Sequence, residues 1–502
     1  MRRGERFYRF RAKKRGGGRA LPGGGRGVAS PAAREAIGAV ATGFREFGEE
    51  LVSGDPLGWP GYPEKLARVR ERTGEGESVV VGEAQVGKTP VVVVAFDFRF
   101  LGGSVGEAAG RRIVEAFERA RESRRAVVSL VATGGSRMQE GMRSLVQLQR
   151  IADACVRARE EGIPHISVLR GPVTGGIWAS LGSSADYIIG VRGAEVAFAG
   201  SRVRGEEATE GEAFTAAGKL RSGFVDAEAE PGEVPGLLRS AVELLRPAGG
   251  EPPAPPEVPR ALGFARPPRD PWVAVMRARS PRRPRAEAYL EDYFERRVEI
   301  SGDRAGGVDA GMLCGFGRRR GRTIAYAAQN GTANTAAGFR TARRLLELAD
   351  RLQLPVLTLI DTPGAGNTAK DEREGVGTAI AELFCTVAGL KVPITSLVIG
   401  EGGSGGALAL AAPDNLWVTP DAYFAVISPE GAAAIVEKDR SRARQVAGRM
   451  KLMPQDLVEL GVVRGIARPK RRPARAIRTS YDAVRRWVVR GHSSGKEHVT
   501  KS

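Results

Sequence analysis

The stretch GIPHISVLRGPVTGGIWASLGSSADYIIG, residues 162–190, decides the fold, because a second version of it, LKVPITSLVIGEGGSGGALALAAPDNLWV, occupies residues 390–418. Each version has a buried-strand run, a glycine pair, and then small apolar residues that suit a tightly packed helix. The glycine pairs are Gly175-Gly176 and Gly405-Gly406. Glycine lets the backbone approach a ligand closely, and the first N–H groups of a helix have no internal acceptor. One such pair is explained by tight packing, but its repetition favours an anion or oxyanion site.

The spacing of further glycine turns predicts two related domains. Gly134 in VATGG and Gly364 in IDTPG are 230 residues apart, and the same 230 residues separate Gly175 from Gly405. Strand patterns alternate with helix patterns in both halves, which favours a layered α/β fold. Each half then has two strand-end turns about 41 residues apart. If these turns meet, they can direct two N–H groups at one oxygen, as an oxyanion hole requires.

The charge of the chain is concentrated at its ends. Of the formal +19, residues 1–30 contribute +9 and residues 464–502 contribute +10, so residues 31–463 are formally neutral. We expect both basic tails to be disordered and solvated. Nucleic-acid binding by the tails is the less favoured alternative, because neither tail has a recognisable binding motif.

Composition argues against several classes of protein. Hydrophobic residues make up 42% of the 502 residues, which is enough for large cores, and we find no secretory signal. No run of about 20 apolar residues predicts a membrane span. The three cysteines, Cys155, Cys314 and Cys385, form no C-x-x-C motif, so we expect neither a disulfide framework nor a cysteine-rich zinc site. A cytoplasmic location is the simplest expectation.

One motif in the first half imitates a nucleotide-binding loop. Residues 82–89, GEAQVGKT, match the phosphate-loop pattern G-x-x-x-x-G-K-[ST]. That loop needs a helix directly after its Lys-Thr, to aim N–H groups at the phosphates. Here Pro90 and four valines follow, which is typical of a strand. The pattern therefore predicts a strand, a turn and a strand.

Shifts in composition divide the chain into five parts. Residues 1–54 form a basic, low-complexity N-terminal extension, and residues 55–246 form the first domain. Residues 247–285 are rich in proline and are interpreted as a linker. The second domain covers residues 286–470, and residues 471–502 form the basic C-terminal tail.

Several long motifs resemble the carboxyltransferase component of bacterial acetyl-CoA carboxylase, in the crotonase-like superfamily. The first domain resembles the beta subunit through FLGGSVGEAAG, ATGGSRMQEG and GIPHISVLRGPVTGGIWAS, and also through FAGSRV. The second domain resembles the alpha subunit through SGDRAGGVDAG, GFRTARRLLELADR, LIDTPGAG, VIGEGGSGGALAL and VISPEGAAAI. The resemblance covers about three-quarters of the chain and implies a beta–alpha fusion. It also implies two crotonase-like β-β-α superhelical domains in tandem.

The resemblance implies which residues act. Gly175 and Gly176 would stabilise the enolate-like oxygen of a thioester, and Gly405 and Gly406 the ureido oxygen of biotin; the reverse pairing is the alternative. Contacts to CoA are expected from Gly134, Gly135, Ser136 and Arg137. Arg137 has a second interpretation as a surface residue at a helix N-terminus. His165 stands at a strand start and is interpreted as structural.

The reaction implied by the resemblance moves the carboxyl group of carboxybiotin to acetyl-CoA and gives malonyl-CoA, the first step of fatty acid synthesis. The biotin would be carried on a biotin carboxyl carrier protein and charged by a biotin carboxylase, so no tightly bound cofactor is expected. A dimer of fused chains is expected as well. Alternatives are a propionyl-CoA or other acyl-CoA carboxyltransferase, or a malonyl-thioester decarboxylase.

Two features depart from the family's pattern. The beta subunit usually has a zinc ribbon with four cysteines near its N-terminus, whereas this chain has no cysteine in that region. We therefore expect no zinc. The turn that begins at Asp361, DTPGAGNTAKDEREG, replaces a Tyr-Pro-Gly run of the family, so the local shape of the pocket is expected to differ.

Overall fold

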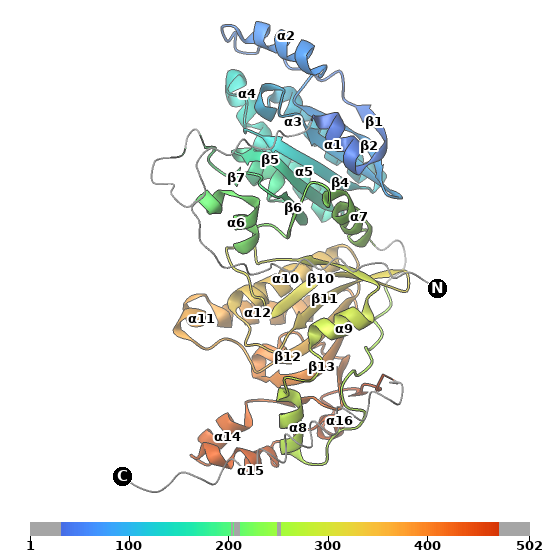
Figure 1. Cartoon of the computed structure of the whole chain (residues 1–502), viewed down its shortest axis with the longest axis vertical. Helices are drawn as coiled ribbons and strands as arrows, with labels where there is room; N and C mark the ends of the chain where they lie inside the picture. The colour runs from blue at the N-terminus through green and yellow to red at the C-terminus, as the bar shows by residue number, and fades with distance from the viewer. Residues whose placement is uncertain (1–31, 202–203, 205–210, 248–252, 471–502) are drawn as a thin grey trace.

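The computed structural model describes residues 32–201, 204, 211–247 and 253–470. It contains two mixed sheets, each of eight strands, which confirms the layered α/β architecture with two similar domains in tandem. Figure 1 shows the domains one above the other along the long axis, with β1 to β8 in the upper domain and β9 to β16 in the lower one. The basic tail at residues 1–30 lies outside the described residues, and of the tail at residues 464–502 only residues 464–470 are described.

The first sheet has the order β1-β2-β3-β4-β5-β6-β8, with β7 beside β5. The strand β2 pairs antiparallel with both β1 and β3, and the remaining neighbours are parallel. The bounds are β1 Thr42–Phe47, β2 Val79–Val86, β3 Thr89–Phe96, β4 Ala126–Thr133, β5 His165–Thr174, β6 Tyr187–Val191, β7 Val196–Ala197 and β8 Ala227–Ala229. The central strands are buried along their whole length, as their valine and isoleucine runs predict.

Residues 82–89, which match the phosphate-loop pattern, form a β-hairpin between β2 and β3, as the sequence predicts. Val86 pairs directly with Thr89, so Gly87 and Lys88 form a two-residue turn between antiparallel strands. Gly87 has a φ of 63°, which a tight hairpin turn of this kind favours in glycine. A strand follows Lys88 in place of a helix, so the loop does not lead into the helix N-terminus that a phosphate loop needs.

The second sheet repeats the first, in the order β16-β14-β13-β12-β11-β10-β9, with β15 beside β13. The bounds are β9 Arg296–Ile300, β10 Met312–Arg319, β11 Arg322–Gln329, β12 Val356–Thr362, β13 Ile394–Gly403, β14 Leu416–Val418, β15 Tyr423–Ala425 and β16 Gly465–Ile466. Again the first three strands are antiparallel and the rest parallel.

Long amphipathic helices cover one face of each sheet. The helices α3 (Glu107–Ser123) and α5 (Gln147–Glu160) do so in the first domain, and α10 (Ala336–Arg351) and α12 (Val376–Gly389) in the second. The other helices that carry the description below are α2 Tyr62–Thr73, α4 Gly141–Leu145, α6 Ala216–Arg221, α7 Val234–Leu244, α9 Ala286–Tyr293, α11 Ala369–Arg373, α13 Ser404–Leu408, α14 Pro429–Val436, α15 Ala443–Ala447 and α16 Pro454–Glu459.

The two domains share one hydrophobic core and a charged seam. A single cluster of buried apolar side chains includes residues from both sheets. At the seam, the fully buried Asp226 carboxylate pairs with Arg344 (2.5 Å) and with Arg304. The backbone N–H of Arg304 also donates to the carbonyl of Gly223 (3.2 Å). These contacts fix the two sheets relative to each other.

Two of the expected non-domain segments contain regular structure that packs on a domain. The N-terminal extension, residues 1–54, contains helix α1 (Ala33–Val40) and edge strand β1, which belong to the first domain because β1 pairs with β2. The proline-rich residues 247–285 contain helix α8 (Pro271–Arg279), which packs against β13 and β15 of the second domain. Proline at the first position of α8 begins that helix, with Asp270 as its N-cap.

Candidate active site

The first glycine turn follows strand β4. Gly135 has a φ of 103°, and its N–H donates to the Thr133 hydroxyl (3.0 Å). Its carbonyl accepts from the N–H of Val105 (2.9 Å), and the N–H of Arg137 donates to the carbonyl of Val105 (2.9 Å). The turn is therefore tied to the loop that leads into α3.

A second turn of the first domain follows strand β5 and touches the first turn. Gly175 has a φ of 74°, and a Cβ added to it would lie 3.0 Å from the Cα of Gly135. The N–H of Gly175 donates to the carbonyl of Phe198 (2.9 Å) and is therefore occupied. A helical turn begins at Gly176, and the N–H groups that open a helix have no internal acceptor. Of the expected pair, Gly176 is thus the better placed donor.

The second domain repeats this arrangement at the ends of β12 and β13. The N–H of Gly364 donates to the Thr362 hydroxyl (3.1 Å), as Gly135 does to Thr133. A Cβ on Gly406 would lie 2.6 Å from the backbone nitrogen of Ala365, so these two turns touch as well. By contrast, a Cβ on Gly405 would meet no atom within 4 Å, so the space in front of this residue is open.

Structurally equivalent positions in the two domains are 229 residues apart, whereas the spacing of the glycines indicates 230. Thr133 and Thr362 occupy the same place, and β5 and β13 end at Thr174 and Gly403. Gly175 therefore corresponds to Ser404, which also has a positive φ, 56°. Gly176 corresponds to Gly405, so the two pairs are shifted by one position. A serine in left-handed backbone conformation is a signal that glycine spacing cannot detect.

Arg137 is not at the surface. Its side chain is fully buried, and its guanidinium pairs with Glu77 and with Glu140 (3.0 Å). Burial alone would lower the pKa of Arg137, but the Glu77 carboxylate beside it raises the pKa above its ordinary value. Burial would likewise raise the pKa of Glu77, whereas the charge of Arg137 lowers it, so both groups are ionised at neutral pH. Because the guanidinium is fully buried, it has no exposed face for a phosphate of CoA. Its contacts with Glu77 and Glu140 instead hold the first turn in place from the protein interior.

Segments from the N-terminal part of the chain complete this network. The Tyr62 hydroxyl, at the start of α2, donates to Glu140 (2.7 Å), and the Glu140 carboxylate accepts from the N–H of Glu107 (2.6 Å). The Ser53 hydroxyl donates to Glu77. Sequence reasoning missed Glu77 and Glu140, because neither lies in a motif with a chemical signature.

The second turn is held by arginines from the segment interpreted as a linker. Arg283 and Arg285 (3.2 Å) pair with the fully buried Asp361, which precedes the Thr362 turn. Arg279, in α8, pairs with Glu401 (2.7 Å) just before the end of β13, and with Glu430 (2.6 Å) of α14. This segment therefore acts as a clamp on the second turn, although its proline content suggested a spacer.

His165 plays the structural part expected of it. The ring is buried, and its Nε2 lies 2.8 Å from the Ser129 hydroxyl. Burial lowers the pKa of His165 to about 4, so the imidazole is neutral at physiological pH. In the residues that the structure describes, no group of three or more His, Cys, Asp or Glu side chains is arranged to hold a metal ion. Nor does any described helix combine the length and apolarity that a membrane crossing demands.

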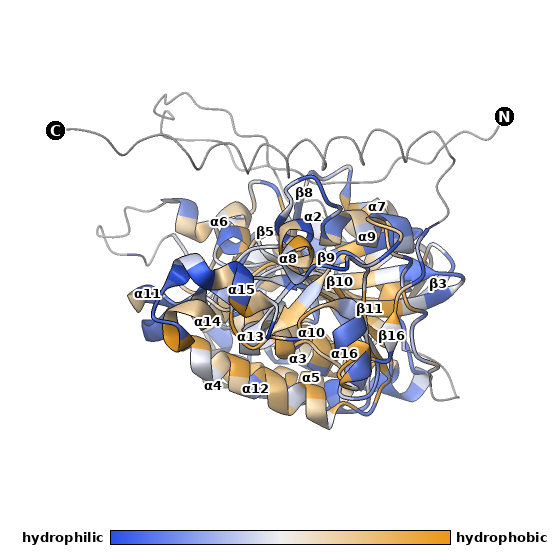
Figure 2. Cartoon of the chain, turned by 90° about the horizontal axis from the view of Figure 1, so that it is seen from below, coloured by the Kyte–Doolittle hydropathy of each residue, from blue (hydrophilic) through white to orange (hydrophobic). Residues whose placement is uncertain are grey.

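Large apolar side chains are exposed near both glycine sites. In the first domain Met138, Met142 and Phe198 are 77%, 66% and 70% exposed. In the second domain Val426 and Ile435 are 80% and 69% exposed. In the ribbon of Figure 2, α4, α5 and α12 lie along the same side of the molecule, and each contains residues coloured as hydrophobic. Isolated apolar residues are common at surfaces, but groups of them mark interaction sites.

Comparison with known proteins places this geometry in a class. Residues 64–221 match the family described as "Carboxyl transferase domain", and residues 269–497 match "Acetyl co-enzyme A carboxylase carboxyltransferase-like". The structure of transcarboxylase 12S superposes with a TM-score of 0.73 at 20% identity, over 94% of this chain and 91% of that one, and so shares the fold. Two crotonase-like domains with matched strand-end turns thus define a tandem carboxyltransferase.

Sequence relatives narrow the class to a family. The chain is 40% identical to the acetyl-coenzyme A carboxylase carboxyl transferase subunits beta/alpha of Salinispora arenicola, over 84% of this chain and 78% of that protein. It is 33% identical to a probable biotin-dependent acyl-coenzyme A carboxylase beta3 subunit of Mycobacterium bovis, over 82% and 84%. The chain belongs to the family of acetyl-CoA carboxylase carboxyltransferases with fused beta and alpha subunits. It is an enzyme, the carboxyltransferase of a biotin-dependent acyl-CoA carboxylase.

Proposed function

We propose that the chain transfers the carboxyl group of carboxybiotin, delivered on a biotin carboxyl carrier protein, to acetyl-CoA and so forms malonyl-CoA. The observation that carries this proposal is the pair of equivalent glycine turns, because the reaction has two oxygens to stabilise. Both the thioester oxygen and the ureido oxygen of biotin gain negative charge in this transfer. The two equivalent glycine turns provide one backbone donor site for each of these two oxygens.

The backbone N–H of Gly176 serves the thioester enolate, and that of Gly405 serves the biotin oxygen. When bound, carboxybiotin supplies the CO₂ and the base that takes the α-proton of acetyl-CoA. The chain itself needs no side-chain base, in keeping with the neutral, buried His165. Its contribution is to hold the two oxygens at rigid turns. Removing one such donor costs roughly 3–4 kcal/mol of transition-state stabilisation in other enzymes.

CoA is proposed to lie along the first turn. Gly134 is exposed and Ser136 is half-buried, so the backbone around them is open to a ligand, while Gly135 is buried between the turns. Arg137 acts here as a positioning residue, since its contacts to Glu77 and Glu140 fix the turn. Its role is therefore indirect, and the phosphates of CoA are left to other groups.

The assembly is proposed to be a homodimer in which the first domain of one chain faces the second domain of the other. The two glycine sites of one chain belong to different sheets, and both are bordered by exposed apolar residues such as Met142 and Val426. Joining these surfaces buries both groups and brings a Gly176 turn opposite a Gly405 turn. The carrier protein and the biotin carboxylase are the further partners of this complex.

The substrate is tested with the reverse reaction. We expect the purified chain to convert malonyl-CoA to acetyl-CoA only when biotin or biocytin is present. We also expect malonyl-CoA to be used with a kcat/KM at least about tenfold above that of methylmalonyl-CoA, since one extra methyl in a fitted pocket costs about that much. The opposite preference would assign the enzyme to propionyl-CoA. Turnover without biotin would indicate a malonyl-thioester decarboxylase.

A further inference from the structure

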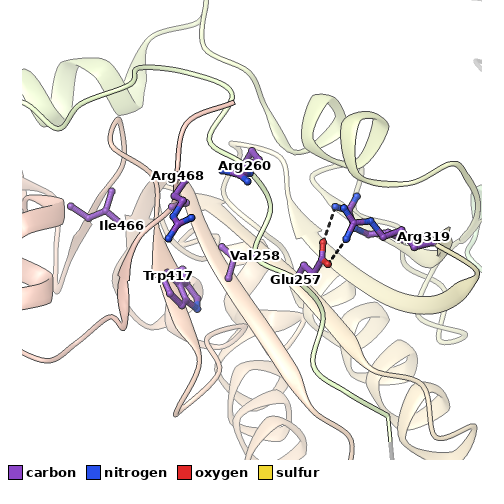
Figure 3. A pocket seen from close by; sticks show the side chains of 9 residues that line it. Glu257, Val258, Arg260, Arg319, Trp417, Ile466 and Arg468 are labelled. Atoms are coloured by element: carbon purple, nitrogen blue, oxygen red, sulfur yellow. Dashed lines mark hydrogen bonds and ion pairs between the residues drawn. The ribbon is translucent and has the colours of Figure 1, made fainter. Parts of the chain in front are cut away.

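A cavity of about 530 Å³ lies in the second domain, apart from both glycine turns. Figure 3 shows it between the segment around Glu257, the end of β10 at Arg319, and the strands that contain Trp417 and Ile466. Trp417 pairs with Leu397 of β13, and Gly403 at the end of that strand is six residues further on. At about 3.3 Å per residue, the cavity is roughly 20 Å from the second turn. It is therefore not part of the site described above.

One wall of the cavity places two arginines side by side. The N–H of Ala261 donates to the carbonyl of Arg468 (2.9 Å), and the N–H of Lys470 donates to the carbonyl of Ala261 (2.9 Å). This parallel bridge, between Ala261 and Pro469, aligns Arg260 with Arg468. Both side chains are exposed, and neither has a carboxylate partner among the described residues. Adjacent like charges are unfavourable unless an anion joins them.

The opposite wall has two more arginines and one carboxylate. Glu257 pairs with Arg319 (3.2 Å) and with Arg320 (2.5 Å). The guanidinium of Arg319 also lies 3.8 Å from the centre of the Tyr293 ring, which holds it in place. Four arginines against one glutamate give the lining a net positive charge. Figure 3 shows the Arg319–Glu257 pair across the cavity from Arg260 and Arg468.

The floor of the cavity is aromatic and apolar. The indole N–H of Trp417 donates to the side-chain oxygen of Asn415 (2.9 Å), so its polar atom is already satisfied. Val258 and Ile466 line the cavity beside it. In the described part of the chain no guanidinium or ammonium stacks on the Trp417 ring. A half-buried ring next to unpaired arginines suits a ligand with a flat ring and a phosphate.

We propose that this cavity binds a nucleoside phosphate, with the base against Trp417 and the phosphate between Arg260 and Arg468. Arginine binds phosphate oxygens through two parallel N–H groups, and two aligned arginines suit a charged phosphate chain. The cavity volume is within the usual range for a small-molecule site, which favours a mononucleotide over a polynucleotide. The ligand would act at a distance from the glycine turns, as a regulator or accessory ligand of the enzyme.

The test is titration calorimetry on the full chain with ATP, adenosine and inorganic tripolyphosphate. We expect ATP to bind more tightly than either fragment. Arg260→Ala and Arg468→Ala are expected to weaken ATP binding at least about tenfold, because each removes a charge-assisted contact. Trp417→Leu is expected to weaken ATP but to leave tripolyphosphate unchanged. The controls are Arg111→Ala, an exposed arginine on α3, and Lys88→Ala in the hairpin turn, neither of which should alter binding.

Several outcomes would overturn the proposal. Equal affinity for ATP and tripolyphosphate, unchanged by Trp417→Leu, would remove the role of the ring. ATP binding that survives both arginine substitutions and is displaced by acetyl-CoA would place the nucleotide in the acyl-CoA site. Binding of single-stranded RNA with none of ATP would make the surface a polynucleotide site. Each variant's unfolding midpoint is measured as well, so that lost binding is not mistaken for lost folding.

Discussion

Gly405→Val is expected to abolish carboxyl transfer while leaving the protein folded. The position is open, because an added Cβ meets no atom within 4 Å and the backbone φ is not positive. A valine there would place its methyl groups in the space where the biotin oxygen must reach the backbone N–H. Loss of one oxyanion donor costs about 10²- to 10³-fold in kcat, and steric exclusion adds to that loss. The assay is biotin-dependent release of acetyl-CoA from malonyl-CoA.

The matched control is Gly377→Val in α12. Like Gly405, Gly377 is helical and has no neighbour within 4 Å of a would-be Cβ, but it is exposed and is not at a strand-end turn. Its valine variant should retain nearly full activity. If Gly405→Val were as active as Gly377→Val, the second turn would have no part in catalysis. Gly406→Val is a poor substitute for this test, because its Cβ would collide with the backbone of Ala365.

Arg137→Met is expected to destabilise the first domain by about 3–5 kcal/mol, because it leaves buried carboxylates without a cation. Glu77 is fully buried and Glu140 nearly so, and both pair with this guanidinium. Methionine fills part of the volume but supplies no donor to either carboxylate. Urea denaturation followed by circular dichroism measures the loss.

The exposed ion pair Arg45–Glu83 provides a control for the loss of unfolding free energy in Arg137→Met. Arg45 is 80% exposed, so Arg45→Met is expected to cost less than about 1 kcal/mol. A similarly small effect for Arg137→Met would mean that the buried network does not hold the first turn. A double variant, Arg137→Met with Glu77→Gln, should recover part of the loss, because it removes one of the two stranded charges.

Much of the fold follows from local sequence patterns. The valine-rich runs predict the buried strands, Pro90 indicates a strand after the phosphate-loop imitation, and the repeated strand–glycine–helix unit predicts two related domains. These features depend on residues close together in the chain. The sequence left open whether the strand-end turns meet; they touch in both domains, at Gly135 and Gly175 in the first and at Ala365 and Gly406 in the second.

What the sequence could not provide depends on distant contacts. The packing of the first turn decides that Arg137 pairs with Glu77 and Glu140. From sequence alone, an arginine beside a glycine pair is equally compatible with a contact to a ligand and with a contact inside the protein. Ser404 was missed because only its backbone, with a φ of 56°, reveals that it replaces a glycine. The clamp of α8 was missed because proline is compatible with both a spacer and the first turn of a helix.

The most direct test of the account mixes two inactive variants. A Cβ on Gly176 would lie 2.2 Å from the Leu148 side chain, so Gly176→Ala is expected to displace the first turn and is first assayed alone to establish that it is inactive. Gly176→Ala and Gly405→Val chains are then unfolded together, refolded and assayed for biotin-dependent turnover of malonyl-CoA. If each active site joins the first turn of one chain to the second turn of another, randomly mixed dimers regain about a quarter of wild-type activity, since half are mixed and each of those has one intact site. No recovery, with mixed dimers present, would contradict an active site built from the two glycine turns of different chains.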